Sequence, residues 1–315
     1  MNDAPADCHD RHVPVLREEV LEHLAPVAGE RMLDCTLGYG GHSESLLERG
    51  VEVFGIDRDP AARALAAQRL ERFGDALVLH DGTYAGVAEG LLERSEHFDG
   101  VLADLGVSSM QLDEPERGFS IRSDHDLDLR MGDGCKETAL DLLDRLSEND
   151  LADLLWYYGE ERRSRQVAPA LKRAREDGMR TGREMAAVIR AAIGGSQRRH
   201  PALRSFQALR IAINDEVGQL ERLLAAIPGL LRPGGRAVII TFHSLEDRLV
   251  KRAFKAHAHA GTLAQVSKKV VTATKSELAA NRRSAPAKLR WAVAPHEATA
   301  PAEAQAEPDE GLGDG

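Results

Sequence analysis

The most suggestive chemistry lies in Asp34–His42, a segment that follows an apolar run and is rich in glycine. Glycine lets the backbone come close to a ligand, and exposed N–H groups in such a turn can bind its polar atoms. Asp57 comes nineteen residues after Gly38, a spacing at which an acid reaches a ribose hydroxyl. Together, these residues predict a nucleotide-like cofactor.

Two cofactors compete for this site. A dinucleotide fingerprint needs glycine at positions 38, 40 and 43, whereas position 43 is Ser43. The acidic start at Asp34 and the pair Gly40–Gly41 favour S-adenosylmethionine, which has no pyrophosphate to bind at a helix terminus. NAD, and with it an oxidoreductase, is the alternative.

Two further segments carry polar residues just after apolar runs. Asp104 begins the segment 104–113, which also contains Gln111. Because reactive groups in open α/β sheets lie outside the carboxyl ends of the strands, Asp104 should face the same cofactor. Tyr84 follows another run and either stacks on adenine or packs in the core. In the segment 242–248, His243 either contacts RNA and assists proton movement, or caps and packs a helix.

The elements that would position these residues alternate along the chain. Strands are expected in 31–41, 51–59, 76–82, 98–106 and 236–244, with helices at 12–24, 42–50, 60–73 and 84–95. Asp59 is the expected N-cap of the third of these helices, with Pro60 at its first position. Alternation of this kind predicts a doubly wound parallel sheet with helices on both faces. Two more strands are expected in 266–275 and 287–294, and 231–235 should form a tight turn.

From about residue 107 to 209 the strand pattern stops. Amphipathic helices are expected at 141–159, 162–177 and 181–195, the last with a capping box of Thr181 and Glu184 and a stop at Gly194. A single long helix is expected over 202–227, and Ser244 with Asp247 should cap a helix at 245–258. We therefore divide the chain into a core of 12–108 and 208–294, an inserted helical domain of 109–207, and disordered ends at 1–11 and 295–315.

Composition narrows the function class. The 315 residues are 43% hydrophobic and lack an apolar run long enough for a membrane span, and the three cysteines are too far apart to form a CxxC pair. We expect a cytoplasmic protein with no membrane contact and no metal. The net charge is −10, yet 162–210 and 248–290 each carry a local charge of +10. These stretches are either phosphate-binding surfaces or ordinary solvated helix faces.

Taken together, the motifs resemble the ribosomal RNA small subunit methyltransferase H family from His12 to about Arg290. The shared stretches include LDCTLGYGGHS, GIDRDP, VLADLGVSSMQLD, ERGFS, HPALRSFQALRIAIN and TFHSLEDRLVK. The resemblance implies a class I S-adenosylmethionine-dependent methyltransferase with an inserted helical domain. It implies methylation of the N4 amine of one cytidine in 16S rRNA, within the small ribosomal subunit.

The resemblance also implies site residues. The donor contacts carried over are Gly40, Gly41, His42, Asp57, Tyr84, Asp104 and Gln111. Asp104 and His243 are the candidate catalytic residues, and Asp104 either assists the reaction or only holds the donor. The basic stretches then become candidate RNA contacts. The aromatic run Trp156–Tyr158 sits in a helical pattern and is expected to pack in a core rather than hold a base.

Besides the NAD-linked oxidoreductase, two rival functions are considered and carbon-5 chemistry is rejected. A DNA amino-methyltransferase is disfavoured because Asp104 is followed by Leu-Gly-Val rather than Pro-Pro-aromatic. A non-catalytic RNA-binding assembly factor would not need the full set of cofactor residues. Methylation at carbon 5 needs a cysteine nucleophile, whereas Cys35 lies in the first strand and Cys135 in the insertion.

Overall fold

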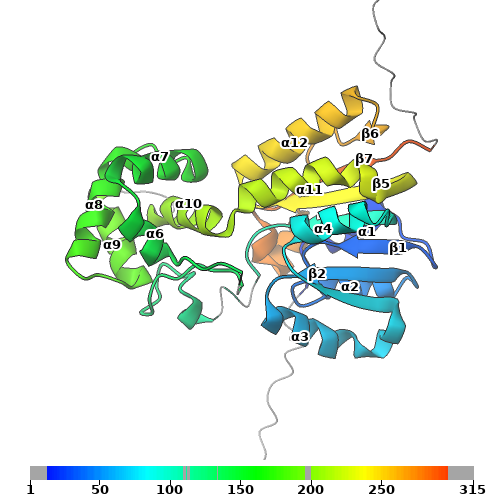
Figure 1. Ribbon diagram of the computed structural model, residues 1–315, viewed down its shortest axis with the longest axis horizontal. Coiled ribbons are helices and arrows are strands. Elements are labelled where there is room, and N and C mark those ends of the chain that lie inside the picture. Colours follow the sequence, from blue (N-terminus) through cyan, green and yellow to red (C-terminus); the bar gives the residue numbers. More distant parts are fainter. Residues whose placement is uncertain (1–12, 109–110, 112–113, 133, 196–199, 297–315) are drawn as a thin grey trace, which may run out of the picture.

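The computed structural model describes residues 13–108, 111, 114–132, 134–195 and 200–296 (Figure 1). Its centre is a seven-stranded sheet in the order β3-β2-β1-β4-β5-β7-β6. The strands are β1 (Arg31–Asp34), β2 (Glu52–Asp57), β3 (Leu77–Asp81), β4 (Phe98–Asp104), β5 (Leu231–Thr241), β6 (Gln265–Val266) and β7 (Lys288–Val293). Strands β1 to β5 pair in parallel, and β7 is antiparallel to both β5 and β6. This is the doubly wound sheet that the alternation predicts, and it is the class I methyltransferase fold that the resemblance implies.

Each face of the sheet has its own apolar core. Neighbouring strand residues point to opposite faces, so Met32 and Leu33 enter different clusters, as do Val238 and Ile239. One face is covered by α4 (Tyr84–Glu93), α11 (Glu216–Leu230) and α12 (Ser244–His259). The other is covered by α1 (Arg17–Leu24), α2 (Gly41–Leu47) and α3 (Pro60–Leu70). The cap of α3 is as expected, with Asp59 accepting the Ala61 N–H and Pro60 in the first turn.

A group of helices lies to one side of the sheet (Figure 1, green). It contains α6 (Ala139–Arg145), α7 (Glu148–Gly159), α8 (Ser164–Glu176), α9 (Gly182–Ile193) and α10 (Ala202–Asn214). A third apolar cluster fills its interior, separate from the two that cover the sheet. The capping box of Thr181 and Glu184 and the stop at Gly194 are present in α9. Helix α10 packs on α7 and leads directly into α11 of the sheet layer.

Four predicted boundaries are wrong. The long helix over 202–227 breaks into α10 and α11 because Asp215 takes a left-handed conformation, with φ of 50°. The helix over 141–159 is two helices, since Ser147 caps α7 after a bend at Leu146. Strand β5 begins at Leu231 and so includes the expected turn 231–235, where Gly234 has φ of 77°. The strand expected over 266–275 is reduced to β6 and a bridge at Val271.

The chain ends predicted to be disordered are 1–11 and 295–315. Residues 1–12 and 297–315 lie outside the described part of the chain. Among the residues that are described, no helix combines the length and the apolar character needed to cross a membrane.

Candidate active site

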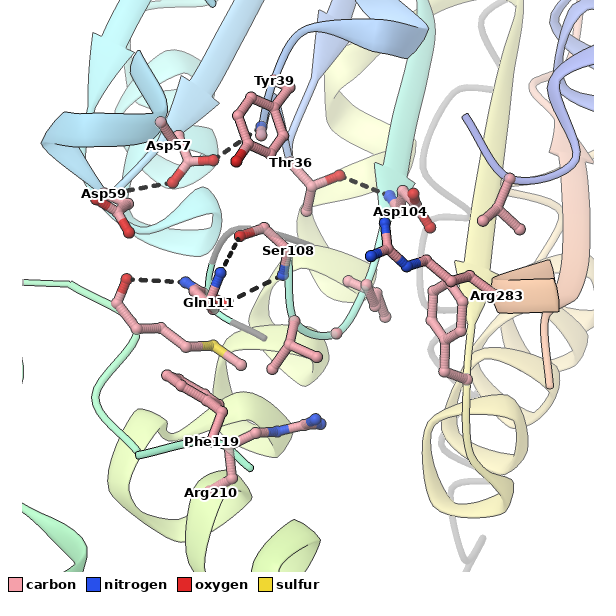
Figure 2. Close-up of a pocket in the computed structure, with 18 of the residues that line it drawn as sticks. Thr36, Tyr39, Asp57, Asp59, Asp104, Ser108, Gln111, Phe119, Arg210 and Arg283 are labelled. Carbon is pink, nitrogen blue, oxygen red and sulfur yellow. Dashed lines mark hydrogen bonds between the residues drawn. The ribbon is translucent and has the colours of Figure 1, made fainter. Parts of the chain in front are cut away.

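A cavity of about 820 Å³ opens at the carboxyl ends of the central strands. It lies where β1 pairs with β4, the point at which the strand order reverses and ligands bind in such sheets. Residues after β1, β2, β4 and β5 line one side, and α10 lines the other with residues such as Phe206 and Arg210 (Figure 2). The cavity therefore joins the sheet to the helical group.

The turn after β1 is held by buried hydrogen bonds. Ser43 Oγ donates to Asp34 Oδ2 at 2.7 Å, and burial raises the pKa of Asp34 despite this contact. The side chain of Ser43 thus sits where a dinucleotide fingerprint would have glycine. Gly41 lines the cavity, but Gly40 does not. Gly40 has a φ of 75°, and a Cβ at this position would lie 2.7 Å from Leu70 Cδ1. Gly40 therefore allows the shape of the turn and its packing on α3 without facing the cavity.

Asp57 is oriented by two backbone groups. Its Oδ2 accepts the Gly38 N–H at 2.9 Å and its Oδ1 accepts the Asp59 N–H at 2.8 Å (Figure 2). Burial raises the pKa of Asp57, and these two hydrogen bonds oppose the rise. Each carboxylate oxygen has a second acceptor site, so the side chain can still accept hydrogen bonds from a ribose at the cavity wall.

Tyr84 lies at the boundary between the cavity and the core, so its packing role is present and its stacking on adenine stays a prediction. It lines the cavity and also packs against the apolar core beneath α4 and α11. Its hydroxyl donates to the Glu216 carbonyl at 3.4 Å, and burial together with nearby Glu216 and Glu246 raises its pKa well above the ordinary value. The phenol therefore stays neutral and offers an aromatic edge to the cavity.

Gln111 is buried at the cavity, and its amide is already used within the protein. Its Oε1 accepts the Ser108 N–H at 3.1 Å, and its Nε2 donates to the Met131 carbonyl at 3.2 Å (Figure 2). These contacts hold the loop after β4 against the segment that leads to α6. Gln111 would therefore affect a ligand at least partly by fixing the position of this loop.

Asp104 and His42 form the most unusual pair. His42 Nε2 lies 3.6 Å from Asp104 Oδ2, and His42 is only 8% exposed. Within the described part of the chain, neither ring nitrogen of His42 nor Oδ1 of Asp104 has a hydrogen-bond partner. The Asp104 N–H donates to Thr36 Oγ1 at 2.6 Å, which fixes the backbone. Buried polar atoms without partners are costly, so this pair is suited to a polar ligand in the cavity.

His243 lines the cavity and also caps a helix. Its Nδ1 accepts the Glu246 N–H at 3.4 Å, so His243, not Ser244, is the N-cap of α12. Its Nε2 lies 3.1 Å from Glu246 Oε1, without hydrogen-bond alignment. A capping role is therefore present, while a catalytic role remains a prediction.

Glu216, His243 and Glu246 are close enough together to suggest a metal site. However, both Glu216 oxygens accept from Arg210 at 2.8 Å, and Glu246 Oε2 accepts the Phe242 N–H at 3.0 Å. A cation would thus find the carboxylates already engaged, with a buried guanidinium beside them. These contacts instead tie α10 to α11 and to the turn after β5.

The aromatic residues at the cavity were missed by sequence reasoning. Phe119, Phe206, Phe242 and Tyr39 line it together with Tyr84. All four stand inside stretches that were singled out for other reasons, namely ERGFS, RSFQ, TFHS and GYGG, so the signal was an aromatic within each motif. The expectation for Trp156–Tyr158 is wrong for two residues, because Trp156 is 52% and Tyr157 69% exposed.

Neither candidate cysteine is set up as a nucleophile. Cys35 lines the cavity, but burial and the nearby Asp34 raise its pKa well above the ordinary value, so it remains a thiol. The Cys135 thiol donates to Asn214 Oδ1 at 3.3 Å, away from Asp104. The site accordingly favours direct transfer without a covalent intermediate.

The two basic stretches differ in how their charges are used. Five of the arginines described in 162–210 form ion pairs with acids of the segment 114–132, of the helical group and of α11. The pairs are Arg165–Asp153, Arg175–Asp144, Arg180–Asp126, Arg183–Asp124 and Arg210–Glu216. In 248–290, Arg248 pairs with Glu160 and Arg290 with Asp247. Arg282 and Arg283 line the cavity itself.

Comparison with known proteins identifies the family of this chain. The model of the MraW methylase family matches residues 9–294. A protein of Synechococcus sp. (strain RCC307) named "Ribosomal RNA small subunit methyltransferase H" is 51% identical over 292 residues, covering 89% of this chain and 94% of the relative. Proteins of the same name from Sorangium cellulosum (strain So ce56) and Dehalococcoides mccartyi (strain ATCC BAA-2266 / KCTC 15142 / 195) are 47% and 42% identical. They cover 90% and 89% of the chain, and 90% and 86% of their own lengths. The chain belongs to the MraW methylase family.

Proposed function

We propose that the protein transfers a methyl group from S-adenosylmethionine to the N4 amine of one cytidine in 16S rRNA of the small ribosomal subunit. The names of the relatives supply the substrate class. The observation that carries the proposal is the buried pair of His42 and Asp104 at the cavity that Asp57 also lines. Among the described residues, the two ring nitrogens of His42 and Oδ1 of Asp104 have no hydrogen-bond partner. The reaction is expected in the cytoplasm, as the dispersed cysteines predict.

The donor fits the side of the cavity next to β1 and β2. Asp57 would accept the ribose hydroxyls, while Tyr84 and the turn at Gly41 and His42 would border the rest of the molecule. Gly40 would contribute by shaping that turn, and Gln111 by holding the loop after β4 in place. When bound, the donor supplies an activated methyl group on a sulfonium.

The target base fits the opposite side. A base must leave its stack to reach a methyl group inside a protein, and aromatic side chains commonly hold it there. Phe119 and Phe206 come from the helical side of the cavity and Phe242 from the turn after β5. The ring of Phe242 lies against the backbone beside Asp104, since a Cβ on Gly106 would be 3.3 Å from it. A flat base between these rings would present its amine to Asp104.

The role proposed for Asp104 follows from the weak nucleophilicity of the cytosine N4 amine. The N4 lone pair is conjugated with the ring, so the amine becomes a nucleophile only as it pyramidalises. A carboxylate oxygen that accepts an N4–H hydrogen bond favours this form and can take the proton as the C–N bond forms. Asp104 Oδ1 is available for this within the described residues, since it has no partner there. Catalysis would otherwise rest on positioning.

We further propose that 109–207 acts as the substrate-recognition domain on a core of 12–108 and 208–294. The helical group has its own apolar cluster, and it contributes Phe119, Leu203 and Phe206 to the cavity. Its position opposite the strand ends would let it bind the RNA that carries the target base.

The test is methyl transfer from labelled S-adenosylmethionine to small subunits that lack the modification, followed by nucleoside analysis. Wild-type protein and the exposed-site control Asp75→Ala should place label in N4-methylcytidine, and Asp104→Ala should lose at least a hundredfold in rate. Donor binding without transfer to subunits or naked RNA would refute the assignment and favour a non-catalytic RNA-binding protein. Label in DNA would indicate the rival methyltransferase.

A further inference from the structure

Two adjacent arginines stand at the mouth of the cavity. Arg282 and Arg283 lie in η4 (Arg282–Ser284), a short turn between α13 (Lys275–Ala280) and β7. Both side chains are exposed, and both line the cavity that contains Asp104. Figure 2 shows Arg283 reaching toward the Asp104 end of the cavity, with Asp57 on the far side of Asp104.

The turn that carries them is held rigidly. Asn281 Oδ1 accepts the Arg283 N–H at 3.1 Å, and Asn281 Nδ2 donates to the Val13 carbonyl at 3.1 Å. The hydroxyl of Ser284, a fully buried residue, donates to the Asn281 carbonyl at 2.7 Å. A turn anchored at both ends presents its arginine side chains with little loss of backbone freedom on binding.

The one acid of this basic stretch is held by a backbone group. Glu277 is the only acid in the sequence from 248 to 290, and its Oε1 accepts the Leu16 N–H at 2.7 Å. That contact joins α13 to the start of α1 and directs the carboxylate to the backbone. Guanidinium groups match phosphate oxygens in a planar, bidentate geometry.

We propose that Arg282 and Arg283 bind the RNA phosphodiester next to the target cytidine and so hold the extruded base at Asp104. This inference rests on the proposed function. The pair is exposed at the mouth, whereas His42 and the turn after β1 are buried, so an RNA backbone running past the mouth meets the arginines first. Phosphate contacts of this kind set position and register and do not read sequence.

The experiment compares two double variants of the full-length protein. Arg282→Ala/Arg283→Ala removes the pair, and Lys268→Ala/Lys269→Ala removes two exposed cations of the same basic stretch that do not line the cavity. Steady-state transfer to unmodified small subunits is measured across a range of salt concentrations. Donor affinity is measured separately by calorimetry without RNA, and folding by thermal unfolding.

We expect the arginine variant to raise KM for subunits at least tenfold and to flatten the dependence of log KM on log salt by about 1 to 2. Donor affinity and unfolding should match wild type. Equal effects in the two variants would show a general charge effect and overturn the proposal. Weakened donor binding without RNA would assign the arginines to the donor carboxylate instead. Absence of transfer by wild type would refute the proposed function and not this pair specifically.

Discussion

Arg117 Nη1 donates to Asp59 Oδ2 at 2.6 Å, and the Asp59 side chain is only 4% exposed. This ion pair joins the segment after β4 to the N-cap of α3. The Asp59 N–H in turn donates to Asp57 Oδ1 at 2.8 Å. Asp57, the acid proposed to bind the methyl donor, is therefore positioned partly by Arg117, which lies in the segment that leads to the helical group.

Removing Arg117 should be strongly destabilising. Arg117→Ala would leave the buried Asp59 carboxylate without its partner, which typically costs about 3–5 kcal/mol. Chemical denaturation checks the free energy of unfolding. Arg145→Ala is the matched control, because its ion pair with Glu137 is on the surface, and it should leave the unfolding midpoint unchanged. Similar midpoints for the two variants would mean that the Arg117–Asp59 pair is not a structural support.

The lowered pKa of Glu246 predicts how the free energy of unfolding depends on pH. Burial alone would raise its pKa, but His243, the Phe242 N–H and Arg210 outweigh burial and hold the pKa below 4.5. An acid with a lowered folded pKa stabilises the protein above its unfolded pKa and loses that contribution as pH falls through the folded pKa. The stability advantage of wild type over Glu246→Gln should thus be constant near neutral pH and shrink below about pH 4.5.

Denaturation of both proteins at several pH values between about 3 and 7 measures this difference. The comparison cancels the carboxylates that the two proteins share. An advantage that stays constant down to the lowest pH would show that the charge of Glu246 does not contribute.

The sheet and its turns were predictable because their signals are local. Alternating apolar runs, Asp59 before Pro60, and Thr181 three residues before Glu184 each depend on neighbours in the chain. The break between α10 and α11 was not predictable, since the apolar pattern continues through Asp215 and no glycine marks its left-handed backbone. At the site, the strand-end residues were found from spacing.

The remainder of the cavity depends on contacts between distant segments. Phe206 meets the strand ends only because α10 leads from the helical group to the sheet (Figure 1). Similarly, His243 becomes the cap of α12 in place of Ser244 because its ring turns back to the Glu246 N–H. Such choices depend on tertiary packing, which spacing along one sequence does not report.

Asn214 joins the end of α10 to the segment 129–131. Its Oδ1 accepts the Met131 N–H at 2.9 Å, and its Nδ2 donates to the carbonyls of Leu129 and Arg210, each at 2.8 Å. Asn214→Ala would leave buried backbone groups unpaired, so we expect a loss of roughly 3 kcal/mol in unfolding free energy. Asn149→Ala, which removes an exposed amide paired with Arg165, is the control. A loss no larger than that of the control would contradict this role.

The contact between His42 and Asp104 leads to the last prediction. With Nε2 at 3.6 Å from Asp104 Oδ2, the imidazole can orient the carboxylate so that Oδ1 faces the target amine. His42→Leu should slow single-turnover transfer at saturating donor by roughly tenfold to a hundredfold, since small errors in position are costly. His42→Asn keeps an N–H donor of shorter reach and should recover part of the rate. Because saturating donor removes any effect on donor affinity, a normal rate in His42→Leu under these conditions would show that His42 serves the donor alone.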